Sequence, residues 1–155
     1  MKALLMGAMA AALLATTAAH AQMKPEDMVE ARKAGYQFMA WNMGKIKAQV
    51  IDGKEPFDQA KVAAAANAIA AIANSGMGAL YSPETTTEQL GKATRLKPEF
   101  FQNLDKAGQI GRDFTVAANQ LASVAADGDR ATIKKAFGDV GGSCKSCHDN
   151  FRAER

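Results

Sequence analysis

The chain has 155 residues, with 19 Lys and Arg against 16 Asp and Glu, so its formal net charge is +3 at pH 7. This length suffices for one domain with a modest core, not for two. The positive charges are not gathered into a basic patch with interleaved aromatic residues, which is the usual footprint of a nucleic-acid interface. We therefore expect no nucleic-acid partner.

The first 21 residues have the pattern of a secretory signal peptide. Lys2 supplies an early positive charge, an apolar run covers residues 3–15, and Ala-His-Ala at 19–21 suits a cleavage site. A retained membrane anchor is the alternative, but the apolar run is too short to span a bilayer. We expect residues 1–21 to be removed, which takes one Lys from the chain and leaves a periplasmic protein without a membrane attachment.

Four helical segments are predicted in residues 22–155, and no strand. The first covers about residues 25–50, where Pro25 and two acids suit a helix start and apolar residues follow at helical spacing. The second covers about 57–75 and is rich in alanine, the best helix former. A longer connection at 80–96 follows, and connections of this length are often functional.

The third helix is predicted from about residue 98 to 126, with an apolar stripe along its length. Asp129 is a plausible N-cap for the fourth helix, whose apolar residues from Ile133 to Phe151 recur every three or four positions. Four helices with mostly short connections predict an all-α fold, an antiparallel four-helix bundle.

The chemistry of the chain is concentrated in the motif Cys144-Lys145-Ser146-Cys147-His148. Cys-x-x-Cys-His is the signature of covalent haem c attachment. On a helix, residues three and four apart share one face, so both thiols and the imidazole can meet one porphyrin. Cys144 and Cys147 would form thioethers with the haem, and His148 would bind its iron axially.

Three other readings of this motif are weaker. A thioredoxin-like redox motif belongs near a strand-helix-strand pattern, and this chain is helical. A structural zinc site takes four Cys or His ligands, and residues 22–155 offer two Cys and one His. A disulfide between residues three apart would close almost no loop and would contribute little to stability. Arg152, one turn beyond His148, packs near the imidazole ring, pairs with a haem propionate, or is an ordinary C-terminal cation favoured by the helix dipole.

A haem motif this near the end of the last of four helices resembles class II c-type cytochromes, and specifically the cytochrome c′ family. Four segments carry the resemblance: residues 32–36 with Met39, 73–81, 97–103 and 136–141. It is closest to members from purple phototrophic bacteria that carry tyrosine on the distal side of the haem.

The resemblance implies roles for further residues. It places Arg32 and Lys33 near the haem propionates, and Thr85 and Thr86 near the haem edge, although relatives have Gln and an acid where this chain has Lys33 and Thr86. It also implies a homodimer packed through the first two helices. Ligand entry that shifts the first helix would then weaken the dimer.

The distal side decides the function. Low-spin relatives place an iron-binding methionine where this chain has Tyr36, and a neutral phenol is a weak iron ligand with a large apolar ring. We therefore expect a five-coordinate, high-spin iron covered by Tyr36, which binds NO and CO, transfers electrons to redox partner proteins, or does both. The alternative is a low-spin electron-transfer cytochrome with Met39 as the sixth ligand; Met28, Met43 and Met77 are more remote candidates. No acid-base group is apparent on the distal side, so we expect no enzymatic turnover.

Overall fold

A computed structural model describes residues 23–154 of the chain. The predicted signal peptide and its cleavage site lie outside this range. The α-helices are α1 (Pro25–Val50), α2 (Gln59–Ala73), α3 (Thr87–Leu90), α4 (Glu99–Gln102), α5 (Leu104–Asp127) and α6 (Arg130–Phe151), and the 3-10 turns are η1 (Met77–Leu80), η2 (Pro83–Thr85) and η3 (Gly91–Ala93). No helix among these is long and apolar enough to cross a bilayer.

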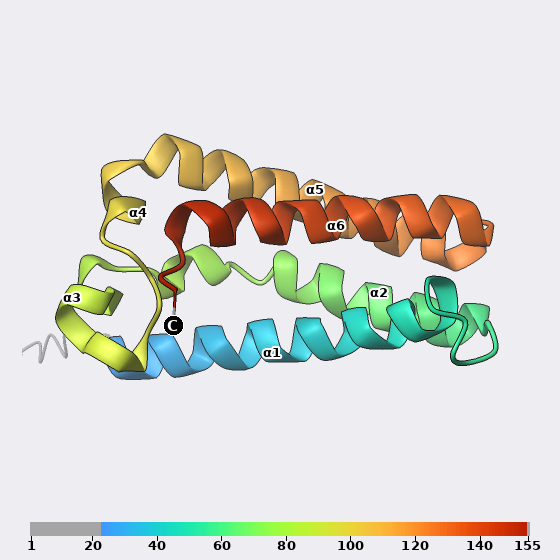
Figure 1. The fold of residues 1–155 in the computed structure, drawn as a ribbon, viewed down its shortest axis with the longest axis horizontal. Helices are drawn as coiled ribbons and strands as arrows, with labels where there is room; N and C mark the ends of the chain where they lie inside the picture. Colours follow the sequence, from blue (N-terminus) through green and yellow to red (C-terminus); the bar gives the residue numbers. More distant parts are fainter. Residues whose placement is uncertain (1–22, 155) are drawn as a thin grey trace, which may run out of the picture.

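The four long helices α1, α2, α5 and α6 lie lengthwise beside one another, and the short elements α3 and α4 gather at one end (Figure 1). α2 packs extensively against α1 and α5, and α5 against α6, whereas α1 and α6 approach each other closely over only a short stretch. This confirms the predicted four-helix bundle, and it leaves α1 and α6 as the loosest seam of the bundle.

The core lies along the alanine-rich face of α2. Val62, Ala65, Ala66 and Ile69 are fully buried there, and they pack in one cluster with residues of α1, α5 and α6. Small side chains on α2 let its neighbours approach closely, and this explains why the tightest packing lies on the side of the bundle away from the α1–α6 seam.

The third predicted helix is wrong in one respect, because the chain breaks it at Asn103. This residue has φ −133° and ψ 47°, and it separates α4 from α5. The Asn103 side-chain amide donates to the carbonyl of Glu99 at 2.9 Å. A local side-chain bond of this kind competes with helix continuation, and periodicity alone does not reveal it. The second helix is also shorter than predicted, since Asp58 caps it by accepting from the backbone N–H of Lys61.

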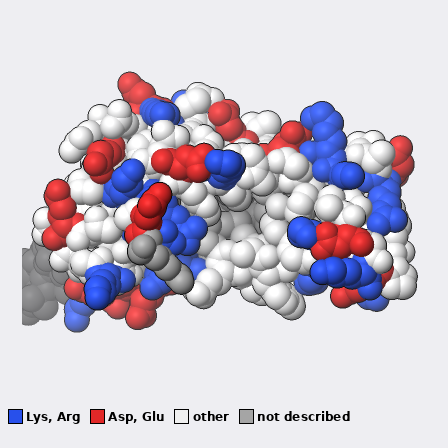
Figure 2. Space-filling view, in the orientation of Figure 1, with Lys and Arg blue, Asp and Glu red and all other residues white. Residues whose placement is uncertain are grey.

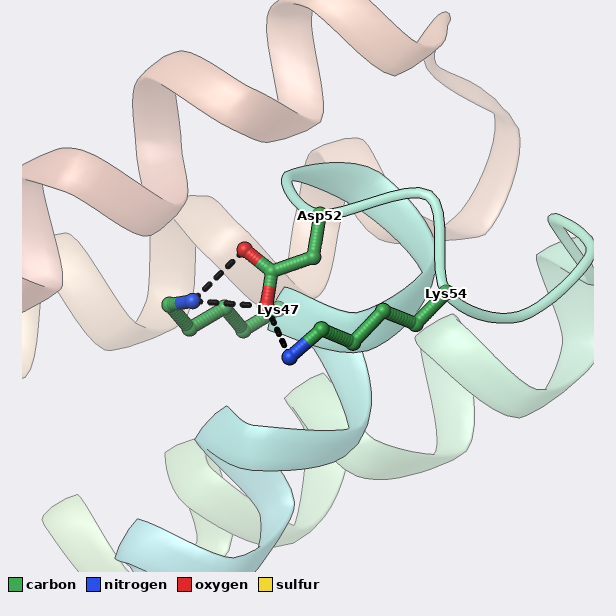
Figure 3. A network of polar contacts seen from close by, with 3 residues as sticks. All are labelled: Lys47, Asp52 and Lys54. Carbon is green, nitrogen blue, oxygen red and sulfur yellow. Dashed lines mark hydrogen bonds and ion pairs between the residues drawn. The ribbon is translucent and has the colours of Figure 1, made fainter.

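Polar contacts tie the other end of the bundle together. Arg130 at the start of α6 donates to the carbonyls of Gln49 (2.6 Å) and Val50 (3.2 Å), which end α1. Beside them, Asp52 accepts from Lys47 at 2.6 Å and forms a longer ion pair of 3.7 Å with Lys54 (Figure 3). The hydrogen bond from Lys47 lowers the pKa of Asp52.

Candidate haem site

Both cysteines of the motif lie on α6, as predicted, and both are half-buried free thiols. Cys144 packs against the edge of the bundle core. Burial raises the pKa of the Cys144 and Cys147 thiols, and the nearby Cys144 raises the pKa of Cys147 further. The thiols are therefore protonated at neutral pH, and they project from one turn of helix beside the seam.

His148 follows on the same turn and is exposed to solvent. Partial burial lowers the pKa of His148, and the charges of Arg152 and Arg95 act in the same direction. The neutral imidazole, which is the form that binds iron, is thereby favoured. Arg152 Nη1 lies 3.5 Å from His148 Nδ1, so the structure brings these two predicted residues together.

Arg32 on α1 is buried, with 5% of its surface exposed. Its guanidinium donates to the Leu80 carbonyl at 2.9 Å and to the hydroxyls of Thr85 and Thr94, both at 3.2 Å. All three partners are neutral, and within residues 23–154 Arg32 forms no ion pair. Buried charges are normally paired, so this cation suits an acidic group such as a haem propionate.

The other residues predicted near the haem edge fall into two groups. Thr85 is fully buried and bonded to Arg32, and Thr94, which sequence reasoning missed, completes the same cluster. Thr86 is also buried, but its hydroxyl donates to the Pro83 carbonyl at 3.0 Å. Lys33 is exposed and reaches only the Ala93 carbonyl, at 3.4 Å. The structure thus joins Arg32 with Thr85 and leaves Lys33 at the surface.

Tyr36 lies one turn beyond Arg32 on α1 and is 42% exposed. Its hydroxyl lies 2.8 Å from the hydroxyl of Tyr81. Burial raises the pKa of Tyr36, the hydrogen bond with Tyr81 lowers it, and Cys147 and Cys144 raise it further. Tyr36 on α1 therefore lies close enough to both α6 thiols for their charges to interact.

Met39 occupies a different environment from Tyr36. It is 5% exposed and belongs to the buried core cluster with Ile46 and Val62. Met43 and Met77 pack against the same cluster, and the Met77 sulfur lies 3.0 Å from where a Cβ on Gly35 would stand. These surroundings suit packing residues.

The seam between α1 and α6 fits a flat apolar group with acidic edges. Figure 2 shows the surface hollowed near the middle of this face, where the walls are uncharged side chains. The α6 thiols and the phenol of Tyr36 lie within range of each other's charge, and Arg32, which forms no ion pair within residues 23–154, lies one turn from Tyr36. Among the described residues no cluster of three or more His, Cys, Asp and Glu could hold a metal ion directly. A porphyrin carrying its own iron is the group that matches these residues.

Comparisons with known proteins agree with this reading. A family model described as Cytochrome C′ matches residues 27–152. The cytochrome c′ of Allochromatium vinosum is 56% identical over 141 residues, which cover 91% of this chain and 90% of that protein. A solved cytochrome c′ described as showing ligand-controlled dimer dissociation is 57% identical, with a TM-score of 0.78 over 84% of this chain and 98% of its own.

A third relative is cytochrome c′ of Alcaligenes xylosoxidans. The ferrous form of one of its variants, solved with bound NO, is 29% identical to this chain, with a TM-score of 0.75 over 85% of this chain and 98% of its own. A variant of the same protein has been solved with bound carbon monoxide. The match of one family model to most of the chain, together with the Allochromatium vinosum relative, shows that the chain belongs to the cytochrome c′ family, whose members carry covalently bound haem c.

Proposed function

We propose that this protein is a periplasmic gas-binding cytochrome, which holds one haem c through Cys144 and Cys147 with His148 as the axial ligand. When bound, the haem supplies an iron that binds small diatomic molecules and exchanges an electron. The protein's residues attach the haem, set its orientation and cover its free face. The cleavable leader predicted from the sequence supports export to the periplasm.

The residues of α6 would act on one side of the haem. Cys144 and Cys147 fix the porphyrin to a rigid helix, and His148 reaches the iron from the same turn. Arg152, 3.5 Å from the imidazole, favours the neutral form of His148 by its charge. Arg32 and the Thr85 hydroxyl would receive a propionate at the haem edge, where the guanidinium lacks an anionic partner.

Tyr36 carries the choice of function, because its phenol lies within charge range of the two cysteines that would hold the haem. Its ring would cover the sixth coordination site without binding the iron, which leaves five ligands and a high-spin centre. NO and CO could enter when Tyr36 moves aside. Bound dioxygen would find little polar stabilisation there. The NO and CO complexes of the Alcaligenes xylosoxidans relative support this choice.

A low-spin electron-transfer cytochrome with Met39 on the iron is the second candidate, since methionine is a known axial ligand. The burial of Met39 in the core cluster favours the five-coordinate site instead. Slow electron exchange with redox partner proteins remains compatible with that site.

The visible spectrum of the reduced, mature protein tests the proposal with Met39→Leu as a matched variant. We expect a broad, five-coordinate band in both proteins and a full conversion on adding CO, because Met39 only packs. Sharp split bands in the wild type that broaden in Met39→Leu would instead establish Met39 as the sixth ligand and overturn the proposal.

We also propose a homodimer built on the first two helices. Phe38 and Trp41 are exposed on α1, at 49% and 59%, and their rings lie 5.5 Å apart. Exposed aromatic pairs of this kind are typical of contact surfaces. The related cytochrome c′ with ligand-controlled dimer dissociation supports the assembly and its sensitivity to ligand.

A further inference from the structure

Tyr81 is a second tyrosine at the site, to which neither the motif nor the resemblance assigns a role. It follows η1, and its hydroxyl lies 2.8 Å from that of Tyr36. These are the two tyrosines of the chain. The contact joins residues 45 positions apart, so it ties α1 to the connection after α2.

Tyr81 is held on both faces of its ring. The Arg32 guanidinium carbon lies 4.3 Å from the ring centroid on one face. Phe100 of α4 stacks on the ring with centroids 4.8 Å apart and planes 14° from parallel. Phe100 in turn packs edge-on against Phe151, which is buried at the end of α6. These contacts restrain the ring of Tyr81.

The guanidinium that covers Tyr81 is itself immobilised. Arg32 donates to Leu80, Thr85 and Thr94, which belong to the same connection as Tyr81. Tyr36, in contrast, is 42% exposed, whereas the Tyr81 ring is packed against Arg32 and Phe100. Of the two rings, that of Tyr36 therefore has more freedom to move.

We propose that Tyr81 is a positioning residue that latches Tyr36 over the sixth coordination site, so that a ligand can enter only when the hydrogen bond between the two phenols breaks. This inference rests on the proposed gas-binding function. It adds a barrier to ligand entry that is set by a residue outside the haem motif and outside α1. A typical hydrogen bond in a protein corresponds to a change of about 2- to 12-fold in an equilibrium or rate.

A mutant cycle on the mature, haem-loaded protein tests the latch. CO rebinding after flash photolysis is measured in the wild type, Tyr81→Phe, Tyr36→Phe and the double variant. Either single variant should speed CO entry by about 2- to 12-fold, since each removes the same hydrogen bond. The double variant should be no faster than the faster single variant. A wild-type rate in Tyr81→Phe, or effects that multiply in the double variant, would overturn the proposal.

Ultraviolet resonance Raman of the tyrosine rings gives a second readout that a purely structural role would not move. With two tyrosines in the chain, the spectrum reports the pair directly. CO binding should remove the phenol–phenol signature in the wild type, whereas Tyr81→Phe should lack that signature both before and after CO is added. A wild-type tyrosine spectrum that does not change when CO binds would contradict the latch.

Phe101→Leu is the matched control. Phe101 packs edge-on against Phe100, at 5.1 Å between centroids, and does not touch the hydroxyl pair. CO should enter Phe101→Leu at the wild-type rate. If CO entered Phe101→Leu as fast as Tyr81→Phe, loosened packing of the aromatic cluster would explain the faster entry, and the latch would be overturned. A wild type that fails to bind CO would refute the proposed function as well, whereas a CO-binding wild type with an unaltered Tyr81→Phe would refute the latch alone.

Discussion

Arg32 links the two halves of the site at the scale of single residues. Burial lowers its pKa, but a guanidinium remains charged at any ordinary pH. Its three neutral partners accept three of its five N–H donors without neutralising its charge. The same side chain therefore stabilises the connection after α2, covers Tyr81 and would supply a positive charge at the proposed haem edge.

Replacing Arg32 with Met should destabilise the protein by about 2 kcal/mol. The change removes three hydrogen bonds from a charged donor, and the Thr85 and Thr94 hydroxyl oxygens lose that donor. Urea unfolding of the holoprotein measures this change. Lys33→Ala is the matched control, since Lys33 is exposed and makes one long contact; we expect a change within about 0.5 kcal/mol. Equal losses in both variants would contradict the role given to Arg32.

Through the resemblance, the sequence alone predicts Tyr36 and Arg32 as haem-site residues. The structure joins Arg32 to Thr85, another residue predicted near the haem edge, by a hydrogen bond. The sequence could not predict Tyr81 or Thr94. Both contact residues more than 40 positions away, and neither lies in a local pattern that distinguishes it from an ordinary loop residue. Pairing across a bundle depends on how the helices dock, which spacing along one helix does not determine.

At the scale of the elements, the four long helices were predictable because each carries a continuous apolar stripe. The break at Asn103 was not, because one side-chain hydrogen bond decides it. The turn between α5 and α6 is more constrained than its sequence suggests. The backbone N–H of Gly128 donates to the Val124 carbonyl at 2.8 Å, and a Cβ at this glycine would collide with that same oxygen.

Gly128→Ala should therefore destabilise the protein by about 1–3 kcal/mol, since the backbone of α5 would have to move away from the new methyl group. Thermal unfolding provides the measurement. Gly138 in the middle of α6 is the control, because a Cβ there meets nothing within 4 Å. Gly138→Ala should stabilise the helix by about 0.5–1 kcal/mol. A stabilising Gly128→Ala would show that the turn tolerates a side chain.

Asp129 caps α6 by accepting from the backbone N–H of Thr132 at 2.7 Å, and this bond lowers the pKa of its carboxyl group. Because the folded pKa lies below the unfolded one, the charged cap adds stability above the unfolded pKa, and this contribution is lost as the pH falls through the folded value. Asp129→Asn keeps an N-cap but removes the titration. Acid unfolding should show the stability difference between the two proteins shrinking from pH 5 to pH 2, and a constant difference would contradict this account.

At the scale of the whole molecule, the bundle is closed tightly along α2 and loosely between α1 and α6. The proposed haem site lies along the loose seam, and α1 carries both Tyr36 and the exposed pair Phe38 and Trp41. One helix therefore connects the distal side of the haem with the proposed dimer surface. A ligand that displaces Tyr36 would therefore also shift the dimer surface on the same helix.

Trp41→Glu should convert the dimer into a monomer at concentrations where the wild type is dimeric, because it places a charge in an apolar contact. Sedimentation velocity of the holoprotein measures this, with Val116→Glu, on an exposed face of α5, as the control that should stay dimeric. Adding CO to the reduced wild type should lower its mass towards that of the monomer. An unchanged mass with CO would separate ligand binding from assembly, and a dimeric Trp41→Glu would place the interface elsewhere.

The proposed function depends most on the attachment of one haem to the last turns of α6. Mass spectrometry of the matured protein, after acid denaturation and solvent extraction, tests it directly. We predict that the chain retains the mass of one haem and that the modified peptide holds Cys144 and Cys147. Complete release of the chromophore into the solvent, or a matured chain with no haem mass, would contradict the account.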